Sequence, residues 1–525
     1  MQVKLAFVFC LALIWSSEAF KLLVVFMMPT KSHANLGDGV VRHLLNAGHE
    51  VTYLTPFHYK NAPPNLRQID ISKNIGHLPC KSIMQNGSVA TDIRIIKTVL
   101  NSLAVKTIEN ENVQKLLHDP REHFDAVIIE WMFTELATVF GAPLIWVSPV
   151  DVGPETIGLI DAMPNPAFAP DMLRGELPPL SFWQRVSGLW GRVSAISLFK
   201  EIEYERLLAP IVQKRGRQPP TYGEVKYNAS LVLGNSHVST GRPLNLPQAY
   251  KPIGGYHIDE NVKPLPEKIM ETAKNGVIYF SMGSNLKSKE WPEEIKYGLL
   301  KMFGELKQTV IWKFEESLPN PPKNVHILQW APQPSILSHP NCVLFISHGG
   351  LLSTTETIHY GVPIIGIPVF GDQFVNVNMA VNKGFAVKVD LTFDLVRDLK
   401  VAIEEITRSS SPLRLLPSAL FSILFYSILF LFYRYTDRVK ELSFIYHHRP
   451  TKPGAELVHW VEHVVQTRGA SHLRSPGLST PLYQRLYLDL IAFIVVGAVV
   501  LLVILRRVCA YVCPKKTVNK SKKNK

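Results

Sequence analysis

The chain has 525 residues, of which 46% are hydrophobic, and a net charge of +13. This length exceeds one compact domain and supplies enough apolar residues for two cores. Eight of the positive charges lie in the last 20 residues, so the rest of the chain carries only +5. The distribution predicts a basic tail and excludes a basic nucleic-acid-binding groove.

The N-terminal residues 1–19 predict a signal peptide. They combine one lysine with a short apolar run, followed by small residues at cleavage-type spacing, Ser17 and Ala19. The run is too short to span a bilayer, so we expect cleavage before Phe20. An N-terminal core strand is the alternative.

Strands alternate with helices through the first half of the chain, which is typical of a parallel sheet with helices on both faces. Strands are expected at 21–28, 50–55, 124–130, 143–148 and 231–237, and helices near 39–47 and 134–140. A Pro- and Gly-rich link follows, so a first domain is predicted over residues 20–257. The helical stretch 182–208 has a mixed aromatic face, which we expect to pack or to line a pocket; membrane contact is the weaker alternative.

The same alternation returns near residue 275 with the apolar runs VIYFSMGS, TVIWKF, VHIL, CVLFIS and VPIIGIPV. A second domain is predicted over residues 258–485. The predicted fold class is therefore α/β, with two doubly wound, Rossmann-like domains facing a cleft.

One predicted strand of the second domain, residues 342–347, is followed by His-Gly-Gly. Gly349 and Gly350 let the backbone turn tightly and approach a ligand, and the next helix directs its free N–H groups to the same place. His348 adds a side-chain donor. This combination predicts a diphosphate site.

Polar side chains nearby suit the rest of a nucleotide sugar. Glu356, on the same helix, can accept hydrogen bonds from ribose hydroxyls. Asp372 and Gln373 follow the next strand at its carboxyl end, where open α/β sheets bind ligands, and can hold the hydroxyls of a hexose. Trp330 and Gln333 offer a flat face and an amide to a pyrimidine base.

The spacing of these residues resembles the signature of the UDP-glycosyltransferase family, and the insect-type members most of all. WAPQPSILSHP, SHGGLLSTTE and PVFGDQ carry the resemblance within residues 330–373, supported by SMGS and PIGGYHID. It implies a GT-B fold, with an acceptor-binding domain at 20–257 and a UDP-sugar-binding domain at 258–485. It also implies an inverting mechanism and no catalytic metal; the sequence agrees in having no Asp-x-Asp pair.

By position, the resemblance assigns base, diphosphate, ribose and sugar contacts in the donor site and adds a second loop that lines the cleft. The base contacts are Trp330 and Gln333; the diphosphate contacts are His348, Gly350 and Ser353; the ribose contact is Glu356; the sugar contacts are Asp372 and Gln373; and the second loop holds Ser281, Gly283 and Ser284.

His33 follows the first strand, in the loop where the family keeps its catalytic histidine, and histidine is a suitable general base near neutral pH. A carboxylate should orient it. Asp125 and Glu130 stand at opposite ends of one predicted strand, about 16 Å apart at ~3.3 Å per residue. His33 lies at a carboxyl end, so Glu130 is the predicted partner, at a place where the family commonly has Asp.

Residues 486–507 predict a transmembrane helix, because 490–505 are uncharged and two arginines follow at once. A buried soluble helix is the alternative. The positive-inside rule predicts a lumenal body and a cytoplasmic basic tail at 508–525, whose last residues resemble a dilysine retrieval signal. We therefore expect a single-pass type I protein of the endoplasmic reticulum membrane.

Two cysteines are expected in the lumenal body, Cys80 and Cys342, and whether they pair is open. Asn86 and Asn228 are candidate glycosylation sites, which predicts a glycoprotein.

The stretch 412–434 interrupts the family resemblance, and residues 415–433 within it form an uncharged apolar run. Its richness in Leu, Phe, Ser and Pro is what pyrimidine-rich codons encode, which suggests a retained intron or a gene-model error. A membrane-associated hairpin is the alternative.

The predicted function is inverting, metal-independent transfer of a hexose, expected to be glucose, from a UDP-sugar to a hydroxyl of a small lipophilic acceptor, as in detoxification. UDP-glucuronate as donor and a homo-oligomeric state remain open, and no cofactor is expected beyond the UDP-sugar co-substrate. The alternative is a non-catalytic small-molecule-binding protein that keeps the fold.

Overall fold

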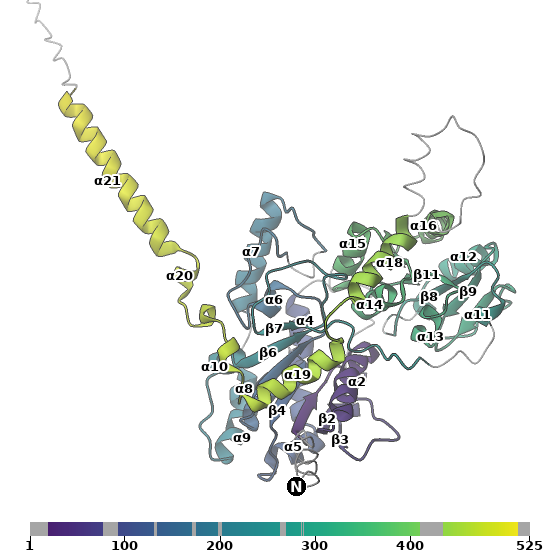
Figure 1. Cartoon of the computed structure of the whole chain (residues 1–525), viewed down its shortest axis with the longest axis horizontal. Coiled ribbons are helices and arrows are strands. Elements are labelled where there is room, and N and C mark those ends of the chain that lie inside the picture. Colours follow the sequence, from purple (N-terminus) through teal and green to yellow (C-terminus); the bar gives the residue numbers. More distant parts are fainter. Residues whose placement is uncertain are drawn as a thin grey trace, which may run out of the picture. The chain divides into compact units, whose positions relative to one another are not determined.

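The computed structural model describes residues 19–76, 93–130, 134–170, 175–197, 202–262, 269–284, 286, 288–409 and 434–512 (Figure 1). Several predictions concern residues outside these ranges: almost all of the signal peptide, Cys80, Asn86, nearly all of the insert and most of the basic tail.

The first domain is built on a seven-stranded sheet in the order β3-β2-β1-β4-β5-β6-β7, in which every neighbouring pair is parallel. The strands are β1 (Lys21–Val25), β2 (Glu50–Thr55), β3 (Leu66–Asp70), β4 (Ala126–Glu130), β5 (Leu144–Ser148), β6 (Ala229–Gly234) and β7 (Tyr250–Pro252). The chain order reverses between β1 and β4. The carboxyl ends of these two strands therefore form a switch point at which ligands bind in open α/β sheets.

The second domain contains a six-stranded parallel sheet in the order β10-β9-β8-β11-β12-β13. Its strands are β8 (Val277–Ser281), β9 (Thr309–Lys313), β10 (Val325–Leu328), β11 (Cys342–Ser347), β12 (Ile364–Gly366) and β13 (Ala386–Lys388). Here the order reverses between β8 and β11, and Ser281 lies in register with Ser347. The loops after these two strands therefore emerge side by side.

Helices follow the strands in both domains, as the alternating pattern predicts (Figure 1). In the first domain they are α2 (Lys31–Asn46), α4 (Ile93–Ile108), α5 (Glu111–His118), α6 (Pro154–Ile157), α7 (Phe182–Ser197), α8 (Ile202–Leu207), α9 (Ala209–Lys214) and α10 (Tyr222–Lys226). In the second they are α11 (Ile269–Thr272), α12 (Glu293–Gly304), α13 (Gln333–Leu337), α14 (Leu351–Tyr360), α15 (Gln373–Asn382), α16 (Leu395–Ser409) and α18 (Arg434–His447). The stretch 134–140, expected as a helix, forms a 3-10 helix over Thr134–Val139.

The helix α2 begins at Lys31, eight residues before the predicted start near residue 39, so His33 lies in its first turn and not in a loop. Gly37 lies in the part of the helix that the sequence did not predict, and glycine disfavours a helix interior. The structure explains this glycine and the next one, Gly39. A Cβ on Gly37 would lie 2.2 Å from the Tyr53 hydroxyl, and one on Gly39 would lie 2.9 Å from the His257 Cα. Bare backbone is needed here because the helix packs this closely.

The chain returns to the first domain after α18. On α19 (Pro453–Gln466), the side chains of Leu457, Val461 and Val464 are buried in the core of the first sheet. In addition, Lys251 Nζ lies 3.5 Å from the centre of the Trp460 ring. The predicted second domain ran to residue 485, but the packing places α19 with the first domain.

The residues from Ser475 onward form a separate unit. It contains the short α20 (Leu482–Arg485) and α21 (Leu488–Val512). Within the described chain, α21 is the one helix long and apolar enough to cross a membrane, and its side chains are exposed. It covers most of the predicted span 486–507 and is a candidate membrane anchor.

Candidate active site

The predicted base and its predicted carboxylate meet at the switch point of the first sheet. His33 comes from the first turn of α2, and Glu130 is the last residue of β4, which pairs with β1. His33 Nδ1 is hydrogen-bonded to Glu130 Oε1. Asp125, at the other end of this strand, instead accepts a hydrogen bond of 2.7 Å from the Lys21 backbone N–H. The strand direction thus places Glu130, and not Asp125, against His33.

Two opposing effects set the pKa of His33. Burial disfavours the imidazolium, but the attraction of Glu130 and the hydrogen bond to it outweigh that effect, so the pKa of His33 is raised. Asp372 of the second domain adds a smaller attraction. The Glu130 side chain is fully buried, so this carboxylate interacts with His33 in a region of low dielectric.

The residues of the predicted diphosphate site converge at the switch point of the second sheet. Gly349 has a φ of +78°, which favours glycine, and Gly350 is the N-cap of α14. The His348 ring lies against two glycines: a Cβ on Gly350 would be 2.7 Å from His348 Nε2, and one on Gly283 would be 2.6 Å from His348 Cε1. The turn after β11 and the SMGS loop after β8 thus hold one imidazole between them.

The pKa of His348 moves in the opposite direction from that of His33. Burial lowers the pKa of His348, and the positive charge of the nearby Lys313 lowers it further, to about 4. The ring is therefore neutral at physiological pH and can donate one hydrogen bond without adding a charge.

Lys313 is a residue of this site that the sequence analysis missed. It ends β9 and is buried, with Nζ donating to the Gly283 carbonyl at 3.1 Å and to Glu315 Oε1 at 2.6 Å. A lysine at the carboxyl end of the apolar run TVIWKF was the available signal. In a parallel sheet that end lies on the same edge as the SMGS loop.

Hydrogen bonds join the residues that are predicted to contact the uracil base, the diphosphate and the ribose. Gln333 Nε2 donates to Ser353 Oγ at 3.1 Å and to Glu356 Oε2 at 2.6 Å. The other oxygen of Glu356 lies 3.7 Å from Nε2 of the buried His257, a second residue that sequence reasoning did not identify. Trp330 stands apart with 68% of its surface exposed, which leaves an indole face open for stacking.

The predicted sugar contacts lie around the start of α15. Asp372 is its N-cap, and Asp372 Oδ2 accepts a 2.9 Å hydrogen bond from Asn376, which also donates to the Gly349 carbonyl at 3.1 Å. The Gln373 side-chain carbonyl accepts bonds from two backbone N–H groups, those of Val369 and Phe370. Its amide nitrogen is therefore the atom that can donate to a sugar hydroxyl. Asn376 was not predicted, although it ties the sugar side of the site to the glycine turn.

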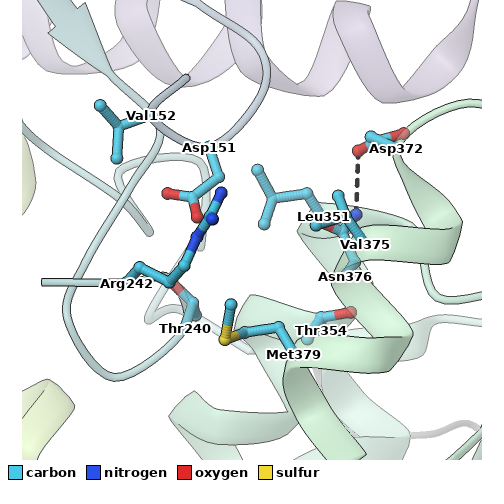
Figure 2. Close-up of a pocket in the computed structure, with 10 residues that line it drawn as sticks. All are labelled: Asp151, Val152, Thr240, Arg242, Leu351, Thr354, Asp372, Val375, Asn376 and Met379. Atoms are coloured by element: carbon cyan, nitrogen blue, oxygen red, sulfur yellow. Dashed lines mark hydrogen bonds between the residues drawn. The ribbon is translucent and has the colours of Figure 1, made fainter. Parts of the chain in front are cut away.

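Asp372 also lines a small cavity between the two domains, which Figure 2 shows. Asp151 and Arg242 of the first domain face the α15 residues Val375 and Met379 across it. The volume of about 20 Å³ suits a water-sized group. Burial raises the pKa of Asp151 to about 6. Arg242 also lines a larger cavity of about 430 Å³, whose other lining residues include Phe168, Leu177 and Leu244.

Ser281 and Ser284 complete the predicted set. Ser281 Oγ accepts a 3.2 Å hydrogen bond from the Gly283 N–H, so it shapes the SMGS loop. Ser284 is half-buried in that loop. Cys342 is buried and forms no disulfide with any residue that the structure describes.

The family described as UDP-glucoronosyl and UDP-glucosyl transferase matches residues 21–412 and 432–524. The break between the two matched parts coincides with the stretch that the sequence analysis set apart as an insert.

Similar proteins of known name span nearly the same length. The chain is 30% identical to UDP-glucosyltransferase 2 of Dactylopius coccus, covering 94% of this chain and 93% of that one. It is 26% identical to an ecdysteroid UDP-glucosyltransferase of Spodoptera littoralis nuclear polyhedrosis virus, covering 87% and 90%. It is 28% identical to UDP-glucuronosyltransferase 2B1 of Rattus norvegicus, covering 81% and 77%.

Solved structures with the same fold include the calicheamicin glycosyltransferase, with a TM-score of 0.55 at 15% identity over 86% of this chain and 99% of that one. A UDP-glucosyltransferase from Polygonum tinctorium gives a TM-score of 0.54 at 14% identity, covering 86% and 100%. The fold is thus GT-B. With the match along both domains, the chain belongs to the UDP-glucuronosyl- and UDP-glucosyltransferase family and is a UDP-glycosyltransferase.

Proposed function

We propose that this enzyme transfers glucose, with inversion, from UDP-glucose to a hydroxyl of a small lipophilic acceptor, and that His33 is the general base. The observation that carries the proposal is the His33–Glu130 pair at the switch point of the first sheet. Asp372 of the opposing domain attracts the charged form of His33 and lines a cavity together with first-domain residues, which supports placing the base and the sugar ligand at one substrate.

In this mechanism, Glu130 holds the proton of His33 on Nδ1 and leaves Nε2 as the acceptor. The acceptor hydroxyl gives its proton to Nε2 as its oxygen forms a bond to the anomeric carbon. The bond from that carbon to the diphosphate oxygen breaks, and UDP leaves with the electron pair on the opposite face. A single displacement of this kind inverts the anomeric configuration.

The leaving diphosphate gains charge as the bond breaks. The N-terminus of α14, the neutral His348 and the cation of Lys313 are suited to stabilise that charge. In the same arrangement, Trp330 stacks on the uracil and Gln333 hydrogen-bonds it. Glu356 holds the ribose, and Asp372 and Gln373 hold the hexose.

Glucose is the preferred sugar in this proposal because two of the compared relatives, from an insect and an insect virus, are named glucosyltransferases. The rat relative is named a glucuronosyltransferase, so UDP-glucuronate is the competing donor to test. We also propose that the reaction is metal-independent, since the sequence lacks an Asp-x-Asp pair.

For location, we propose a type I protein of the endoplasmic reticulum membrane, anchored by α21 with both domains in the lumen. The two arginines after the apolar run and the lysine-rich tail support this orientation. Asn228 is exposed, as a glycosylated asparagine must be.

The test uses the full-length enzyme in detergent or nanodiscs, with UDP-glucose or UDP-glucuronate and a set of phenols and steroids, in the presence and absence of EDTA. We expect UDP release with UDP-glucose, an unchanged rate with EDTA and a β-configured product by NMR. A product of retained configuration, or loss of activity with EDTA, would contradict the mechanism. Turnover with UDP-glucuronate alone would overturn the choice of glucose.

A further inference from the structure

The helix α7 exposes an aromatic face to solvent. Trp183 and Trp190 are 75% and 72% exposed, and Phe182, Val186 and Leu189 are exposed as well. The sequence predicted that this face would pack or line a pocket, and the structure contradicts packing. Large exposed aromatic patches are uncommon on soluble proteins and mark interaction sites.

The exposed apolar residues form one stripe. At 100° per residue, the five side chains from Phe182 to Trp190 fall within an arc of about 120°. Gly188 lies on the opposite face, and Arg185 lies at the edge of the stripe with its guanidinium 6.0 Å from the Phe182 ring centre. Tryptophan and phenylalanine on one face, with arginine beside them, are typical of a helix that lies in a membrane interface.

A bilayer is also close by if α21 is the membrane anchor, as proposed above. The link from Arg474 to the start of α21 at Leu488 is 13 residues, Ser475–Tyr487. Fully extended, it reaches about 45 Å. The tether therefore keeps the first two domains near the lipid headgroups, which raises the effective concentration of membrane at α7.

We propose that α7 is a second membrane contact and lies in the plane of the lumenal leaflet. Phe182, Trp183, Val186, Leu189 and Trp190 insert at the boundary between headgroups and acyl chains, and Arg185 reaches lipid phosphates. This inference rests on the proposed anchor, and it extends the proposed function by placing the catalytic body on the surface in which lipophilic acceptors dissolve.

The experiment compares two neighbouring positions on opposite faces of α7. Leu189→Cys lies in the stripe. The control Gly188→Cys lies on the other face, where an added Cβ meets no atom within 4 Å. Both are made in the full-length chain, with Cys80, Cys509 and Cys513 replaced by serine. Each is labelled with the environment-sensitive dye NBD and placed as a single copy in phosphatidylcholine nanodiscs.

We expect the dye at position 189 to emit at shorter wavelength, and we expect doxyl-labelled lipid to quench about half of its fluorescence. The dye at position 188 should instead be quenched by aqueous iodide. UDP binding measured in both variants confirms that the fold is kept. Equal iodide quenching at both positions, in variants that bind UDP, would overturn the proposal.

Two further outcomes separate this inference from its premises. If position 189 is shielded only in nanodiscs that hold two copies, the stripe is a contact between chains and the proposal is wrong. If the chain does not co-purify with nanodiscs, the anchor fails and the α7 proposal fails with it. If the chain stays in the disc but α7 does not insert, the α7 proposal is wrong and the proposed membrane anchor α21 is retained.

Discussion

His33 and His348 each lie at the switch point of one sheet, yet their pKa values move in opposite directions. Burial acts against the charged form of both rings. Glu130 reverses that effect for His33, whereas Lys313 reinforces it for His348. The comparison teaches that this fold supplies the position of a histidine, and that the neighbouring charge decides between a basic and a neutral ring.

The largest effect is expected at the base itself. His33→Ala should reduce kcat by about 10²–10⁴-fold, because the acceptor proton loses its receiver. The Kd for UDP should not change, since His33 lies on the other domain from the diphosphate site. Calorimetry with UDP and turnover with a phenol check both parts. Near-normal turnover in this variant would remove His33 from the mechanism.

Glu130→Gln should act through His33. Without the carboxylate the pKa of His33 falls, so the acid limb of the kcat/KM profile moves to lower pH. The direction follows because the base works in its neutral form, and activity rises as pH passes upward through its pKa. We also expect kcat to fall by about 10²-fold, as the ring loses its orientation. A pH–rate profile measures the shift.

Asp125→Asn is the matched control for this change, since Asp125 lies on the same strand but at its other end. It should leave the acid limb in place. If the acid limb of the kcat/KM profile moves in Asp125→Asn but not in Glu130→Gln, Asp125 and not Glu130 is the carboxylate that acts on His33.

A smaller effect is expected at Lys313, in the proposed diphosphate site. Lys313→Met should raise the Kd for UDP by about 10-fold, equivalent to ~1.4 kcal/mol, through loss of one charge-assisted hydrogen bond. Because the variant leaves Glu315 without its lysine partner, Lys313→Met/Glu315→Gln is the control that removes both charges. An unchanged Kd in both variants would show that Lys313 only holds the SMGS loop.

The smallest effect is expected from removing the insert. Tyr435 of α18 is hydrogen-bonded to Glu405 of α16, so the helices on either side of the insert already lie together and a short connection can join them. Deletion of residues 412–433 should therefore keep kcat within about twofold, and the melting temperature should not fall. A variant that no longer folds would show that the insert is an integral part of the enzyme. Transcript reads that skip the insert would support the gene-model error.

Much of the donor site could be predicted from the sequence because its parts lie close together along the chain. The strand 342–347, the glycine turn and the helix from Leu351 lie within one short stretch, and each has a local signal. The start of α2 was missed for a local reason as well: Gly37 weakens the helical pattern before residue 39, and only its close packing against Tyr53 explains it. Asn376 was missed because a single polar residue within a helix carries no pattern. Lys313 was missed although its place at the end of an apolar run was an available signal.

By itself, the sequence determined the alternation of strands and helices, the glycine turns, the apolar C-terminal run and the family. These depend on periodicity and on neighbours along the chain. The pairing of His33 with Glu130 was expected from strand direction, but only the tertiary structure decided the other contacts. It returned α19 to the first core, placed Lys313 against the SMGS loop and left the aromatic face of α7 uncovered. Such contacts depend on strand register and on the packing of whole elements, which no local pattern encodes.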